Sequence, residues 1–177
     1  MSYNANMNAG NHTKNIALCG LFTALTAALT LLAVPIPGGT GFIHAGDGII
    51  FFSLFILPFP YAMAVGGIGG MLADLFLAPV FAIPTLIIKP VMVLIARLII
   101  GKGRSRNIFR MSLAFLTASL VMQIEYFLVD LVIFYEATEV AIGVALFGLI
   151  QTAVSVPLAV LLVRVAPKQL LIPKENP

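Results

Sequence analysis

A few polar side chains stand inside long apolar runs of this chain, and they are the residues most able to recognise a ligand. An ionisable group at the centre of a bilayer costs about 2.5–3.5 kcal/mol to insert, so each one needs a partner or a function. Their types are hydrogen-bonding and ionisable, with no nucleophile or metal-ligand pattern among them. The candidate ligand-binding residues are His44, Asp47, Lys89, Glu125, Tyr126, Asp130 and Gln151.

Two helical patterns group these residues. At about 100° per residue, Glu125, Tyr126 and Asp130 fall within an arc of about 140°, so all three can face the interior of a helix bundle. Gly148, Gln151 and Ser155 recur at spacings of three and four. This second pattern predicts a polar stripe that either contacts a ligand or hydrogen-bonds to a neighbouring helix.

Lys89 is the basic residue among these candidates, and two roles remain open for it. It either pairs with Asp74, which we expect at a similar depth, or it contacts the ligand. Phe and Tyr residues are frequent in the same part of the chain, and aromatic rings beside a few polar groups suit a flat heteroaromatic ligand. The excess of carboxylates over Lys89 favours a neutral or cationic ligand.

The composition indicates an integral membrane protein. Hydrophobic residues make up 60% of the 177 residues and charged residues 10%, against about a quarter charged in soluble domains. Cys19 is the single cysteine, so neither an internal disulfide nor a cysteine zinc site is expected. The net charge of +3 is too small to indicate a nucleic-acid partner. No cofactor, metal site or catalytic group is predicted.

The apolar runs predict an all-α fold of six transmembrane helices in one membrane domain. A polar, mobile tail is expected over 1–14. Proline and glycine break the chain over 35–48, which predicts a long, conformationally permissive loop of a kind that is often functional. The expected helices cover residues 15–34, 46–58, 61–78, 84–101, 108–134 and 139–165.

The distribution of Lys and Arg predicts the orientation. Cytoplasmic loops are enriched in these residues. They occur before the first helix, between the fourth and fifth, and after the sixth, while the opposite loops contain none. A six-helix, multi-pass protein of the cell membrane with both termini in the cytoplasm satisfies this pattern.

Small residues on the first helix predict a contact surface. Gly20, Ala24 and Ala28 recur at four-residue spacing, and such a ridge allows close approach of another helix. The ridge serves either internal packing or a partner protein.

Three sequence segments together resemble the substrate-binding S components of energy-coupling factor (ECF) vitamin transporters, in the riboflavin, hydroxymethylpyrimidine and vitamin B6 subgroup. They are GFIHAGDGIIFF from Gly41, GGIGGMLADLF from Gly66 and PTLIIK ending at Lys89. The resemblance spans nearly the whole chain. On the last helix, relatives often show Asn-x-x-Gln, whereas this chain has Gly148 and Gln151.

This resemblance implies a protein that captures a vitamin at the outer face. It also implies three kinds of partner: a transmembrane coupling subunit that contacts the Ala24 and Ala28 ridge, two ATPase subunits, and the membrane lipid. The sequence has no Gly-x-x-x-x-Gly-Lys-Ser/Thr loop, so this chain is not expected to hydrolyse ATP itself, and the energy for transport must come from partners or from an ion gradient.

We expect vitamin B6 or hydroxymethylpyrimidine ahead of riboflavin and pantothenate. One alternative function is a stand-alone ion-coupled carrier, although no internal repeat is visible. Another is an intramembrane aspartyl protease using Asp47 and Asp74, but His44 replaces the first glycine of its Gly-x-Gly-Asp signature.

Overall fold

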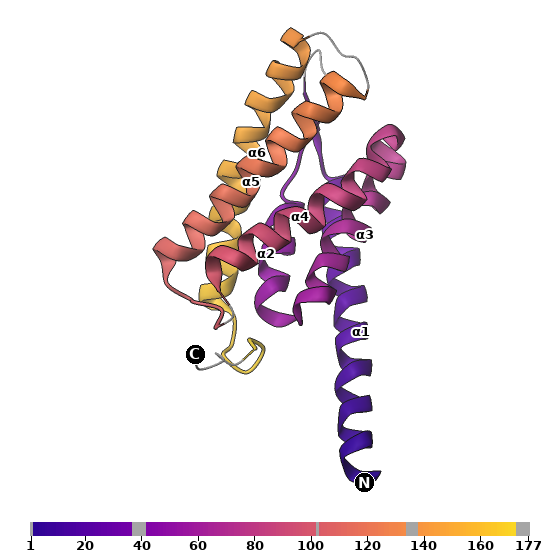
Figure 1. Ribbon diagram of the computed structural model, residues 1–177, viewed down its shortest axis with the longest axis vertical. Helices are drawn as coiled ribbons and strands as arrows, with labels where there is room; N and C mark the ends of the chain where they lie inside the picture. Colours follow the sequence, from indigo (N-terminus) through magenta and orange to yellow (C-terminus); the bar gives the residue numbers. More distant parts are fainter. Residues whose placement is uncertain (1, 37–41, 102, 134–137, 173–177) are drawn as a thin grey trace.

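The structure is a computed structural model that describes residues 2–36, 42–101, 103–133 and 138–172, with side chains from residue 12 onward. Its helices are α1 (Ser2–Leu31), α2 (Gly46–Ile56), α3 (Phe59–Leu77), α4 (Ala82–Ile100), α5 (Ile108–Val132) and α6 (Thr138–Val165) (Figure 1). A 3₁₀ turn, η1 (Pro79–Phe81), precedes α4. Two short antiparallel strands, β1 (Val34–Pro35) and β2 (Phe42–Ile43), lie between α1 and α2.

The predicted all-α membrane fold is confirmed, with one helix shorter than a full span. Within the described residues, five helices are long and apolar enough to cross a bilayer, whereas α2 has 11 residues. At 1.5 Å per residue α2 is about 16 Å long, roughly half of the hydrocarbon thickness. It therefore lies inside the bundle, between full-length helices.

Proline and the strand pair move the helix ends from their predicted positions. The first helix stops at Leu31 instead of 34, because Val34 pairs with Ile43 of β2. The second stops at Ile56 instead of 58, because the residue before a proline avoids helical backbone angles and Leu57 is extended. The segment expected as a mobile tail, 1–14, is described from residue 2 as the first part of α1.

The two ends of the bundle differ in charge. Figure 1 shows α1 beginning and α6 ending at the same end of the molecule, where the α4–α5 connection also lies. Arg104, Arg106, Arg110 and Arg164 belong to that end, as the positive-inside rule expects of the cytoplasmic side. The β1–β2 hairpin extends toward the opposite end.

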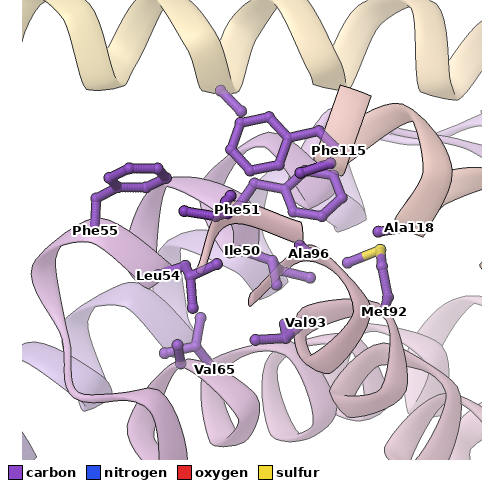
Figure 2. Close-up of a cluster of buried hydrophobic side chains, with 14 of the residues drawn as sticks. Ile50, Phe51, Leu54, Phe55, Val65, Met92, Val93, Ala96, Phe115 and Ala118 are labelled. Atoms are coloured by element: carbon purple, nitrogen blue, oxygen red, sulfur yellow. The ribbon is translucent and has the colours of Figure 1, made fainter. Parts of the chain in front are cut away.

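Helix α2 forms the centre of the hydrophobic core. Phe51 stacks on Phe115 of α5, with ring centroids 4.5 Å apart, and Figure 2 shows Leu54, Val65 and Met92 in the same cluster. These side chains are fully or almost fully buried. This core holds α2 in position from its cytoplasmic side.

The C-terminal end of α2 is also fixed by hydrogen bonds. The Arg104 guanidinium donates to the Leu57 carbonyl at 2.9 Å, and the Ile172 amide donates to the Phe55 carbonyl at 2.9 Å. Carbonyls at a helix end have no partner within the helix, and burial makes an outside donor necessary. The N-terminal end of α2 is thereby held next to the β1–β2 hairpin, close to the polar residues described below.

Candidate ligand-binding cavity

A cavity of about 70 Å³ lies where α3 and α5 end and α4 and α6 begin, away from the basic end of the bundle. Side chains from α1, β2 and all four of these helices line it. Its aromatic residues are Phe42, Phe81 and Tyr126. Its other polar and ionisable residues are Thr30, His44, Asp74, Thr85, Lys89, Gln123, Asp130 and Gln151.

Asp47, at the start of α2, binds two of these lining residues from behind. Lys89 Nζ donates to Asp47 Oδ1 at 2.6 Å, and Gln151 Nε2 donates to Asp47 Oδ2 at 2.7 Å. Asp47 is 1% exposed and Lys89 3% exposed, so the ion pair is shielded from solvent. Asp47 itself is not among the residues that line the cavity. It therefore fixes the positions of Lys89 and Gln151.

The same network supports the backbone that enters α2. The His44 amide donates to Gln151 Oε1 at 3.3 Å, and the Gly46 amide donates to His44 Nδ1 at 3.1 Å. Non-helical backbone inside a membrane protein is tolerated where its polar groups find protein partners. His44 and Gln151 thus satisfy backbone donors at the point where the hairpin joins the site.

On the opposite wall of the cavity, Thr85 links Asp74 and Tyr126 through two hydrogen bonds that run in one direction. Its hydroxyl donates to Asp74 Oδ2 and lies 2.7 Å from the Tyr126 hydroxyl. A threonine hydroxyl carries one proton, so Thr85 must accept the proton of Tyr126. The Tyr126 oxygen consequently has lone pairs, but no proton, to offer a ligand.

Aromatic rings close the sides of the cavity. Phe81 meets Tyr126 edge-on with centroids 6.1 Å apart, and Phe42 lies 5.8 Å from the His44 ring. Lys89 Nζ lies 5.7 Å from the centroid of Tyr126, within range of a cation–π contact. This combination of ring faces and a few polar edges suits a flat heteroaromatic molecule.

Comparison with known families assigns the chain. The family model described as ECF-type riboflavin transporter, S component, matches residues 10–168. The chain belongs to this family. No curated protein matches it. Membership makes it a multi-pass, vitamin-binding membrane component of a transporter, not a member of an enzyme family, and implies coupling and ATPase subunits as partners.

The predicted ligand-binding residues of this S component divide into three groups. His44, Lys89, Tyr126, Asp130 and Gln151 line the cavity. Asp47 lies behind it, and Glu125 of α5 is absent from the lining. The expected pairing of Lys89 with Asp74 is wrong, because its ion-pair partner is Asp47. Lys89 also lines the cavity, and its contact with the ligand stays a prediction.

The ridge on α1 faces outward from the S component. Gly20, Ala24 and Ala28 are exposed, and a Cβ added at Gly20 would meet nothing within 4 Å. The opposite face of α1 carries the buried residues Phe22 and Thr26. Internal packing therefore does not account for the ridge.

The polar lining residues that sequence reasoning missed are Thr30, Thr85 and Gln123. For Gln123 a signal was present, because Gln123, Tyr126 and Asp130 follow the i, i+3, i+7 spacing of one helical face. Thr85 and Thr30 gave no signal, since threonine is common in membrane helices and only the arrangement of neighbours shows its role.

His44 gives the S component a pH-dependent stability. It lies in the connection before α2, and burial lowers its pKa from 6.5 to about 4, opposed by Asp47. The unfolded chain therefore binds a proton that the folded chain excludes between these pH values. We expect stability to fall by up to about 1.4 kcal/mol per pH unit as pH decreases from 6.5 toward 4.

Unfolding measured in detergent micelles across this range tests the expectation, with His44→Gln as the matched variant. Glutamine retains an acceptor for the Gly46 amide but does not titrate. An equally steep pH dependence in both proteins would assign the effect to another group.

Proposed function

We propose that this S component captures an uncharged, flat heteroaromatic vitamin of single-ring size, of the vitamin B6 or hydroxymethylpyrimidine type. The observation that carries the proposal is the lining of the cavity, which combines aromatic rings with hydrogen-bond acceptors at Tyr126 and Gln123. Such vitamins present ring faces for stacking and hydroxyl or amino protons for these acceptors.

The charge of the lining supports a ligand without negative charge. Among the described lining residues, Lys89 is the only Lys or Arg, and its positive charge is neutralised by the ion pair with Asp47. Asp74 and Asp130 add carboxyl groups to the same cavity. An anion such as pantothenate or a phosphorylated vitamin would meet no uncompensated cation among these residues.

The size of the cavity favours a vitamin with a single ring over one with three fused rings. A volume of about 70 Å³, lined by the hairpin and by helices α1, α3, α4, α5 and α6, leaves little room for a tricyclic ring system with a sugar-alcohol chain. Riboflavin is the second candidate, because the family description names it.

Ligand identity can be tested with purified protein freed of co-purifying small molecules. Isothermal titration calorimetry would compare pyridoxine, hydroxymethylpyrimidine, riboflavin and pantothenate. We expect one of the single-ring compounds to bind at least about tenfold more tightly than riboflavin, and no detectable binding of pantothenate. Tighter binding of riboflavin would replace the single-ring assignment, and tight binding of pantothenate would contradict the charge argument.

We further propose that the ridge of Gly20, Ala24 and Ala28 contacts the coupling subunit. Its exposure on α1, opposite the packed face, supports this role. Ala24→Leu or Ala28→Leu should abolish co-purification with the coupling and ATPase subunits while vitamin affinity stays within about twofold, because the added bulk prevents close helix approach on the exposed face of α1.

Leu21→Ala, at an exposed position beside the ridge, is a suitable control. A Leu substitution that weakens vitamin binding as strongly as assembly would show that the ridge supports the fold of the S component itself.

A further inference from the structure

The side-chain amide of Gln123, on α5, occupies the space beside Gly148 on α6. A Cβ added at Gly148 would lie 2.0 Å from Gln123 Oε1, 2.3 Å from its Cδ and 2.5 Å from its Nε2. These separations are far below contact distance. The amide of Gln123 therefore fills the place that any side chain at position 148 would take.

Hydrogen bonding fixes the orientation of this amide. Gln123 Nε2 donates to the Gly148 carbonyl at 2.9 Å. A carbonyl can only accept, so the amide nitrogen must face it, and Oε1, the amide atom nearest the Cβ position of Gly148, takes no part in this hydrogen bond. Over the described part of the chain, Oε1 accepts no hydrogen bond. Gln123 and Gly148 both line the cavity, so Oε1 is an acceptor available to a ligand there.

The second amide of the cavity, that of Gln151, is already engaged. Its Nε2 donates to Asp47 and its Oε1 accepts from the His44 backbone amide. Gln151 is 6% exposed, and both of its polar atoms hold the base of the site together. Of the two glutamines, Gln123 is the one whose carbonyl oxygen remains for recognition.

We infer that Gln123 is a specificity-determining ligand contact, and that the glycine at position 148 is what admits its amide. Its Oε1 accepts an N–H or O–H from the edge of the bound vitamin, while the Gly148 carbonyl holds the amide in that orientation. The inference rests on the proposed function and assigns the ligand-facing amide to α5 instead of α6.

The two residues should therefore act as one unit. Pyridoxine, hydroxymethylpyrimidine and riboflavin affinities would be measured by calorimetry for the unmodified protein, Gln123→Ala, Gly148→Ala and the double variant. Each single substitution should weaken binding of the better ligand by about 5- to 100-fold, the usual effect of removing a buried hydrogen-bond partner. The double variant should be no weaker than the weaker single variant, because Gly148→Ala acts by displacing an amide that is already gone.

Gly143→Ala is the matched control. Gly143 lies on the same helix, and a Cβ there would meet nothing within 4 Å. Its affinity should equal that of the unmodified protein. Thermal unfolding of each variant would show whether the protein is folded, and Gln123→Ala tests the inference even where Gly148→Ala fails to fold.

The outcomes separate this inference from the proposed function. Unchanged affinity in Gln123→Ala, or losses that add in the double variant, would overturn the inference and leave the proposed function standing. If the unmodified protein binds none of pyridoxine, hydroxymethylpyrimidine and riboflavin, the proposed function is overturned and the inference with it.

Discussion

Replacing Asp47 with alanine should lower the free energy of unfolding by about 3–5 kcal/mol, the largest loss we expect from a single substitution in this chain. The change leaves the Lys89 ammonium buried without its ion-pair partner and removes the acceptor for Gln151. Chemical denaturation in detergent micelles would measure the loss. The double variant Asp47→Ala with Lys89→Met should recover part of it, because no charge is then left uncompensated.

Glu125→Gln is the control variant for Asp47→Ala, because it removes a carboxylate charge without removing a hydrogen bond of Oε2. The Glu125 carboxyl oxygen Oε2 has no hydrogen-bond partner in the described structure, and its residue is outside the cavity. The unfolding free energy of Glu125→Gln should fall by less than about 0.5 kcal/mol, because no hydrogen bond of Oε2 is lost. A similar loss in Asp47→Ala and Glu125→Gln, or a double variant less stable than Asp47→Ala, would contradict the assigned ion pair.

The helices could be predicted from the sequence because their causes are local. Apolar runs of membrane-spanning length, ended by proline, glycine or charged residues, define α3, α4, α5 and α6 to within a few residues. The stop at Ile56 also has a local cause in Pro58, although the predicted end, residue 58, is two residues late.

The partner of Lys89 could not be predicted because it depends on the depth of α2. Counting residues from the outer ends of α3 and α4 places Asp74 and Lys89 at a similar depth, which favoured that pair. Helix α2 is half a span long, and its first turn lies inside the bundle and presents Asp47 to Lys89. No helical spacing within the sequence contains that information.

The prediction of Glu125 as a ligand contact, with Gln123 overlooked, shows a different limit. A charged residue in an apolar helix attracts attention because its insertion cost is high. The spacing of Gln123 with Tyr126 and Asp130 was the better guide to the cavity face. Its relation to Gly148 depends on the packing of α5 against α6, which the sequence does not specify.

Close packing of α1 against α3 depends on a glycine whose substitution should also have a large effect. A Cβ added at Gly69 would lie 2.9 Å from Thr26 Cβ and 3.0 Å from the Thr23 carbonyl oxygen, both at or next to the α1 backbone. Neither atom can move aside by a side-chain rotation. Gly69→Ala should therefore force the helices apart and lower the unfolding free energy by about 1–3 kcal/mol, as overpacking of a close-packed interior does.

Gly20→Ala distinguishes this crowding from a general effect of glycine replacement in helices. It adds the same methyl group to α1 at a site where nothing lies within 4 Å, so its unfolding free energy should be unchanged or slightly higher, given the helix propensity of alanine. Denaturation of both variants under the same conditions tests the difference.

Gly69 faces the buried Thr26 and lies one residue from Gly70, whose added Cβ would meet Thr85 Cγ2 at 2.6 Å. Loss of the α1–α3 contact should consequently weaken vitamin binding as well as stability, and a stable Gly69→Ala protein would show that α1 can shift outward without cost.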